Sequence, residues 1–139
     1  MLVEHARTLV GIADAAHAES DAGGTPVVTL LACSLSDNEI EIELAPGTRL
    51  RALHGDAPIA RERTTCNYGL APDLAHIATS HGMVVGAVDD TGEVRAVERT
   101  DHPFFVATLY QPQLSSAPGR PHPVWRAFVQ AVTSPRAQP

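Results

Sequence analysis

Clustered positive charge, cysteine and long apolar runs are all scarce in this chain. Ten Lys and Arg residues stand against sixteen Asp and Glu, so the net charge is -6 and no basic cluster offers the face that nucleic-acid binders need. Two cysteines, Cys33 and Cys66, do not make a disulfide framework, and reduced thiols are expected. No apolar run is long enough to span a bilayer and no signal peptide precedes the first helix-like segment, so a cytoplasmic location is expected.

Spacing motifs for metals and phosphates are missing as well. The sequence contains no Cys-x-x-Cys, no His-Glu-x-x-His and no glycine-rich phosphate loop of standard spacing. The seven histidines are scattered, and His76 and His81 are five residues apart, which places them on different sides of a helix. We therefore expect no metal site and no cofactor.

The sequence contains strand and helix patterns that are typical of an α/β domain. Its 139 residues are enough for one hydrophobic core and too few for two. The segment 39–44 alternates isoleucine or leucine with glutamate, which predicts a half-buried antiparallel strand with a solvated acidic face. Asp89 to Gly92 predict the turn of a β-hairpin. We expect helices at 2–10, 72–81 and 123–132, strands at 27–33, 39–44, 48–53, 83–88, 93–99 and 104–110, an extended segment at 61–70, and loops at 18–26 and 115–123.

The C-terminal stretch 101–132 resembles the class I glutamine amidotransferase domain of CTP synthase. That family carries a Phe-His-Pro-Glu motif whose His and Glu are the base and the orienting acid of a Cys-His-Glu triad, and this chain reads Tyr110, Gln111, Pro112 and Gln113. The resemblance extends to the segments 3–21, 44–55, 62–72 and 92–108. The sequence is most similar to the branch described as CTP synthase C-terminal region-related.

The resemblance implies an α/β fold of the class I glutamine amidotransferase type, flavodoxin-like, with a mixed sheet flanked by helices. The family's nucleophilic cysteine and its glycine-rich oxyanion loop precede the helix that begins here at Leu2, so the N-terminal half of the fold is expected to be lacking. We expect a partial domain over 1–133 and a disordered tail over 134–139. An incomplete sheet exposes an edge and apolar surface that another chain would cover, either a partner or a second copy.

The substitutions at Gln111 and Gln113 argue against the family's chemistry, because a glutamine amide does not accept a proton as a general base near neutral pH. The leading hypothesis is a divergent, non-catalytic relative that binds a small, glutamine-like ligand or a partner protein. One alternative is a glutaminase subunit that supplies ammonia to a CTP synthase-type ligase in pyrimidine nucleotide biosynthesis. Another is thiol chemistry at Cys66.

The candidate site residues follow from this alignment. Cys66 is the candidate for chemistry, with Arg63 and His54 as neighbours that would activate it; the alternative is an unreactive strand residue. The expected ligand-binding residues are Arg63, Cys66, Asn67, Tyr68 and Gln111. Gln111 and Gln113 either bind a polar ligand or pair only with backbone, and Tyr68 is either a cleft residue or a half-buried aromatic. Cys33 is expected to pack in the core.

Overall fold

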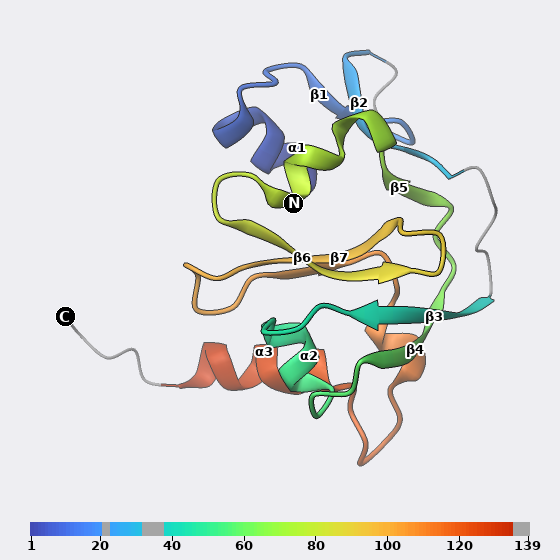
Figure 1. Ribbon diagram of the computed structural model, residues 1–139. Helices are drawn as coiled ribbons and strands as arrows, with labels where there is room; N and C mark the ends of the chain where they lie inside the picture. Colours follow the sequence, from blue (N-terminus) through green and yellow to red (C-terminus); the bar gives the residue numbers. More distant parts are fainter. Residues whose placement is uncertain (21–22, 32–37, 135–139) are drawn as a thin grey trace.

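A computed structural model describes residues 1–20, 23–31 and 38–134 of the chain. Among these residues the strands form two sheets (Figure 1). The smaller has the order β1-β2-β5, with β1 (Ala15–His17) parallel to β2 (Thr25–Leu30) and β2 antiparallel to β5 (Tyr68–Leu70). The larger is antiparallel and has the order β4-β3-β6-β7-β8. Its strands are β3 (Asn38–Leu44), β4 (Ile59–Thr64), β6 (Met83–Asp89), β7 (Val94–Arg99) and β8 (Val106–Thr108).

Helical segments pack beside each of the two sheets. The helix α1 (Leu2–His5) and the π-helical turn η1 (Ala6–Val10) lie with the 3-10 segment η2 (Pro72–Thr79) beside the smaller sheet (Figure 1). The helices α2 (Arg49–Leu53) and α3 (Pro123–Thr133) contact each other on the side of the larger sheet, and the 3-10 turn η3 (Pro112–Ser115) packs on β4. No helix within the described ranges is both long enough and apolar enough to cross a membrane.

The core of the larger sheet follows the predicted alternation in β3. Ile42 and Leu44 are buried with Leu50 of α2 and Val124 of α3, whereas the glutamates of β3 are exposed. The predicted hairpin between β6 and β7 is also confirmed. Its turn is held by the Asp89 carboxylate, which accepts hydrogen bonds from the backbone N–H groups of Thr91 and Glu93, both at 3.0 Å.

The prediction of a strand over 48–53 is wrong, because this segment is the helix α2. The hydroxyl of Thr48 accepts a hydrogen bond from the backbone N–H of Arg51, which is an N-cap. In addition, the Glu98 carboxylate on β7 accepts from the N–H groups of Arg49 and Leu50 at 2.8 and 2.9 Å. Glu98 lies almost fifty residues away in the sequence, so this second cap is a tertiary contact that a local pattern does not reveal.

The structure differs from the predicted elements at three further places. The segment 72–81 is a 3-10 helix that ends at Thr79, and β1 lies in a segment where no strand was expected. The segment 104–110 is not a fully buried strand, since β8 covers only Val106–Thr108, is half-buried, and forms the last strand of its sheet. Of the expected tail, only Ser134 lies within the described residues, and Cys33 lies outside them.

The predicted amphipathic helix at 123–132 is confirmed as α3, but most of its apolar face is not covered. Val124 is buried, whereas Trp125 is 43% exposed and Val132 is 62% exposed. Phe128 and Val129 are exposed on the same helix. These four apolar side chains therefore form an exposed apolar surface along α3.

Candidate functional site

The two glutamines at the triad-like positions lie after β8, at the start of η3. The backbone N–H of Gln111 donates to the carbonyl of Arg63 at 2.9 Å, and the side-chain oxygen of Gln111 accepts from the backbone N–H of Thr65 at 2.8 Å. Gln113 is exposed. The Gln111 amide therefore already holds the end of β4 in place through a backbone contact.

The other predicted ligand-binding residues follow β4 along the chain. Cys66 is half-buried, its backbone N–H donates to the Thr64 hydroxyl at 3.1 Å, and its thiol lies 3.6 Å from the carbonyl oxygen of Tyr68. The ring of Tyr68 lies 5.2 Å from the ring of His17, centroid to centroid. The backbone carbonyl of Asn67 accepts a hydrogen bond from the backbone N–H of Leu31. The structure thus gathers Arg63, Cys66, Asn67, Tyr68 and Gln111 around the connection between β4 and β5.

A cavity of about 530 Å³ lies beside the two glutamines, between β8 and α3. Its lining includes Gln111, Gln113, Tyr110, Trp125 and Phe128, and does not include Cys66. The two amides therefore line a mostly apolar cavity, whereas the thiol of Cys66 does not line it.

A second constellation was not foreseen from the sequence: His54, Glu62 and His122 meet in the interior. Oε1 of Glu62 lies 3.0 Å from Nε2 of His54 and 2.8 Å from Nε2 of His122, and Glu62 is only 2% exposed. The two imidazole rings are 5.5 Å apart in an edge-to-face arrangement. The three residues come from the end of α2, from β4 and from the residue before α3, so the contact joins these elements.

Hydrogen-bond partners fix where the protons lie in this cluster. Nδ1 of His54 lies 3.0 Å from the carbonyl of Leu50, so both nitrogens of this ring face oxygen atoms, an arrangement that favours the doubly protonated imidazolium. Nδ1 of His122 accepts the backbone N–H of Val124 at 3.2 Å, so its proton is on Nε2 and points at Glu62. Glu62 is then a carboxylate that accepts from both rings.

The shifts in the pKa values of His54 and Glu62 agree with these positions of the protons. The hydrogen bond to Glu62 raises the pKa of His54 above its usual 6.5, although burial opposes the shift. Burial alone would raise the pKa of Glu62, but the hydrogen bonds from His122 and His54 outweigh it and the pKa is lowered from 4.5. His54 is thus paired with Glu62 and the carbonyl of Leu50, whereas the sequence had placed it as an activator of Cys66.

The same three side chains offer two imidazoles and one carboxylate within 4.8 Å of one another, which is a ligand set that transition metals use. His54 fits such a role, because its Nδ1 would keep the bond to Leu50 while Nε2 bound a metal. His122 does not fit, because a neutral ring bound through Nε2 carries its proton on Nδ1, where the Val124 N–H already donates. The arrangement suits an ion pair that caps α3 better than a metal centre.

Sequence spacing could not have revealed this cluster, since His54 and Glu62 are eight residues apart and Glu62 and His122 are sixty apart. One local signal did exist. A His-Pro pair directly before an apolar helical pattern places Pro123 at the first helical position and His122 at the cap.

Similar proteins of known identity show the family to which this chain belongs. No family model matches the chain. CTP synthase of Carboxydothermus hydrogenoformans is 32% identical over 144 residues, which cover 94% of this chain and 26% of the relative. The chain is a homologue of the glutamine amidotransferase domain of CTP synthase. CTP synthase of Archaeoglobus fulgidus is 32% identical over 148 residues, 99% of this chain and 28% of the relative. The amidotransferase homologue thus spans about a quarter of the length of these curated relatives.

A solved structure confirms the expected class I glutamine amidotransferase-like fold of this CTP synthase homologue. The glutaminase domain of Trypanosoma brucei CTPS, solved with bound acivicin, matches with a TM-score of 0.86 and 23% identity. The match covers 99% of this chain and 58% of that one. A putative GMP synthase protein from Thermoplasma acidophilum matches more weakly, with a TM-score of 0.55, 13% identity, and coverage of 75% of this chain and 47% of that one.

Proposed function

We propose that this chain is a divergent amidotransferase-like module that does not hydrolyse glutamine by a Cys-His-Glu route. It binds a small ligand through the surface around Gln111, and it binds a partner polypeptide through the exposed apolar residues Val129 and Val132 of α3. The observation that carries the proposal is the state of Gln111: an amide stands where the family has its base, and its oxygen is held by the Thr65 N–H. An amide so placed can hydrogen-bond a ligand but cannot remove a proton from it.

The surroundings of Gln111 support recognition by hydrogen bonds and apolar contact. The adjoining cavity combines two glutamine amides with aromatic surface from Trp125 and Phe128. Small-ligand sites are typically of this composition, with a few polar groups in a mostly apolar lining. A glutamine-like molecule, which carries an amide of its own, is the ligand class that pairs with two amide side chains.

Ammonia release tests this proposal directly. The purified chain is incubated with L-glutamine and ammonia is measured by a coupled dehydrogenase assay, with expected release no higher than in buffer alone. Binding is measured separately by the shift in melting temperature with L-glutamine, which rises with concentration if the native state binds the ligand. Gln113→Ala should lower that shift, whereas Glu39→Ala, on the exposed face of β3, should not. Ammonia release by the chain would instead establish a glutaminase.

A cytoplasmic location is part of the same proposal. The unpaired thiol of Cys66 suits a reducing compartment, in which structural disulfides do not form. Fractionation of the organism that encodes the chain tests this, and recovery from an extracellular or envelope fraction would contradict it.

A further inference from the structure

The buried carboxylate of Glu62 is tied to two walls of the cavity beside Gln111. One wall is η3, whose Ser115 hydroxyl donates a hydrogen bond to Oε2 of Glu62 at 3.5 Å. The other wall is α3, whose N-cap residue His122 places Nε2 2.8 Å from Oε1 of the same carboxylate. Both elements supply lining residues of this cavity, so a displacement of the Glu62 carboxylate would move two of its walls.

Further hydrogen bonds join these two walls to each other. The backbone N–H of His122 donates to the hydroxyl of Ser116 at 3.0 Å, and Ser116 directly follows η3. The N–H of Ser116 in turn donates at 3.3 Å to the carbonyl of Gln113, which lines the cavity. The end of η3 and the start of α3 therefore form one connected unit with Glu62.

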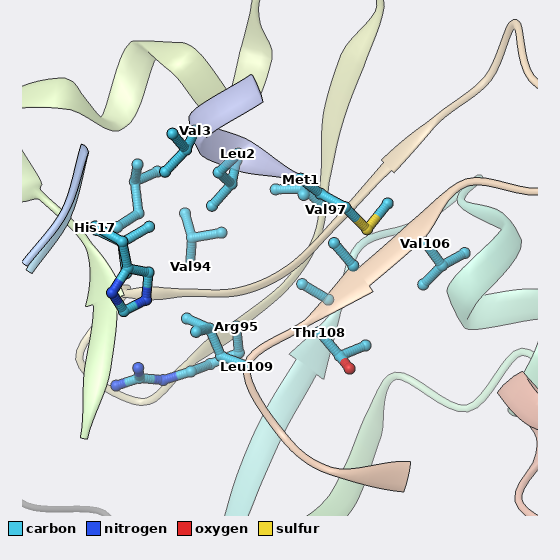
Figure 2. A pocket seen from close by; sticks show the side chains of 14 residues that line it. Met1, Leu2, Val3, His17, Val94, Arg95, Val97, Val106, Thr108 and Leu109 are labelled. Atoms are coloured by element: carbon cyan, nitrogen blue, oxygen red, sulfur yellow. The ribbon is translucent and has the colours of Figure 1, made fainter. Parts of the chain in front are cut away.

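The third wall of the cavity is the strand β8, which is held by its pairing with β7. Val106 and Thr108 of β8 line the cavity beside Gln111. The same two residues line a second cavity, of about 360 Å³, and Figure 2 shows them among the side chains around it. Val106 thus offers a matched control, because it lines the cavity from a wall that strand pairing holds.

The charge on His54 keeps the Glu62 carboxylate in its position. Both ring nitrogens of His54 lie 3.0 Å from an oxygen, Nε2 from Oε1 of Glu62 and Nδ1 from the carbonyl of Leu50. A neutral imidazole has one proton, so one of its nitrogens would present a lone pair to an oxygen at that distance. The ring or the carboxylate then has to move, and Glu62, which is 2% exposed, also loses a charged donor.

Two other titratable side chains lie around Glu62. A second proton on His122 would belong on Nδ1, which accepts the Val124 N–H. Burial, followed by the charge of Glu62, raises the pKa of Tyr110, whose ring lies 6.2 Å from that of His122, so its phenol stays neutral. The hydrogen bond to Glu62 raises the pKa of His54 above 6.5. The charge that is lost as the solution becomes alkaline is therefore that of His54.

We propose that Glu62 positions two walls of the cavity beside Gln111 and that loss of the His54 proton loosens both, so the cavity binds its ligand more weakly in alkaline solution. This inference rests on the proposed function, because it names how ligand binding at that site is regulated. The held arrangement is fully present below pH 6.5, where His54 is charged, and is lost as pH rises through its raised folded-state pKa.

Trp125, the one tryptophan of the chain, reports on the α3 wall without any ligand. Its side chain lines the cavity and is 43% exposed, so quenching of its fluorescence by acrylamide measures how firmly this wall is held. The quenching constant of the parent chain should rise at least about 1.5-fold between about pH 5.5 and 8.5, after correction with N-acetyltryptophanamide at each pH. Equal corrected constants at the two pH values overturn the proposal.

Three variants separate positioning of the wall from stability, each measured at a temperature at which its circular dichroism is that of a folded chain. His54→Gln, which cannot titrate, should give equal quenching constants at both pH values. His122→Asn cuts the link from Glu62 to α3 and leaves the His54–Glu62 pair in place. Its quenching should be high at both pH values while its stability still depends on pH. Val106→Ala, on β8, should keep the pH dependence of the parent. If His122→Asn also keeps it, Glu62 does not position α3 and the proposal is wrong.

Binding of L-glutamine tests the consequence for the ligand. Its dissociation constant, measured by calorimetry, should be about three- to tenfold higher at about pH 8.5 than at about pH 5.5, because apparent affinity falls with the fraction of the binding-competent state. It should be equal at the two pH values in His54→Gln, and equal values in the parent overturn the inference.

The quenching and binding measurements keep the two proposals apart. Absence of L-glutamine binding at both pH values would contradict the ligand class of the proposed function, and the quenching constants would then decide the inference alone. Ammonia release from glutamine would contradict the proposed function and leave the quenching result standing. Quenching that does not depend on pH would contradict the inference and leave the proposed function unaffected.

Discussion

The imidazole of His54 and the carboxylate of Glu62 form a buried ion pair, with Nε2 and Oε1 3.0 Å apart. The other ring nitrogen of His54 faces the Leu50 carbonyl, so both of its protons are engaged. His122 adds a second donor to the same carboxylate oxygen. Removing one member of a buried pair leaves an uncompensated polar group, which costs more than the pair contributes when it is intact.

This pair predicts that stability falls as the solution becomes alkaline. The pKa of His54 is raised above 6.5, so its contribution is fully present below pH 6.5 and is lost as pH rises through the folded-state pKa. The pKa of Glu62 is lowered from 4.5, so its contribution is present above pH 4.5 and is lost as pH falls through the folded-state pKa. The cluster therefore stabilises the fold most between about pH 4.5 and 6.5.

Urea unfolding at about pH 5.5, 7 and 8.5 measures this dependence. The free energy of unfolding should decrease from the first pH to the last by roughly 1–2 kcal/mol more in the parent chain than in His54→Gln, which cannot titrate. His76→Gln, which alters an exposed histidine of η2, serves as the matched control and should keep the slope of the parent. Equal slopes for the parent and His54→Gln would show that the pair does not titrate as assigned.

His122 is predicted to stabilise the fold in two separable ways. His122→Asn keeps a side chain that caps α3 but does not reach Glu62, and should cost about 1–2 kcal/mol for the lost buried hydrogen bond. His122→Ala loses the cap on the Val124 N–H as well and should cost about 1 kcal/mol more. Thermal or urea unfolding of both variants checks the order, and an equal cost for both would argue against the capping role.

Local patterns predicted those parts of the fold whose causes are local. The alternation in β3, the turn from Asp89 to Gly92 and the apolar spacing of α3 each act over a few residues, and the structure confirms all three. The helix α2 was mistaken for a strand because its second cap comes from Glu98 on β7. The cluster around Glu62 was missed for the same reason, since its contacts form only when α2, β4 and α3 pack together.

For the candidate site residues, the resemblance predicted which residues lie near one another, and their roles stay predictions. The alignment with the family placed Gln111 near Arg63 and Cys66, and the structure brings these residues to one corner. Sequence could not show that the Gln111 oxygen is occupied by the Thr65 N–H, because that contact spans 46 residues. Nor could it show that the apolar residues of α3 stay exposed, since an amphipathic pattern predicts a face to be covered but not the element that covers it.

Asp89 is predicted to be the main support of the β6–β7 turn. One of its oxygens accepts from Thr91 and Glu93, and the other pairs with the buried Arg95. Asp89→Ala should therefore cost about 3–5 kcal/mol, because it also leaves the Arg95 charge without its closest partner. Asp90→Ala, at the exposed neighbour, should change the free energy of unfolding by less than about 0.5 kcal/mol. Equal decreases in the free energy of unfolding for the two variants would show that Asp89 is not the main support of the turn.

Replacing Cys66 with serine, which has a side chain of nearly the same shape, tests for thiol chemistry. The Cys66 thiol donates to the Tyr68 carbonyl, and a serine hydroxyl can make the same contact, so Cys66→Ser should leave the melting temperature within a few degrees of the parent. The rate of peroxide consumption is then measured for the parent and for the variant. Equal rates would exclude a catalytic thiol, and a rate that falls with the substitution would establish one.

Gln111 is predicted to hold the end of β4 rather than to act as a catalytic group. Gln111→Ala removes the acceptor for the Thr65 N–H, so the Thr65 amide should exchange several-fold faster and stability should fall by about 0.5–1 kcal/mol. Gln113→Ala, at the exposed second position, should leave that amide unchanged. Gln111→His tests the chemistry, because it restores an imidazole at the family's base position. We expect no ammonia from glutamine in this variant, since no cysteine among the described residues lines the cavity beside that position, and measurable release would refute that expectation.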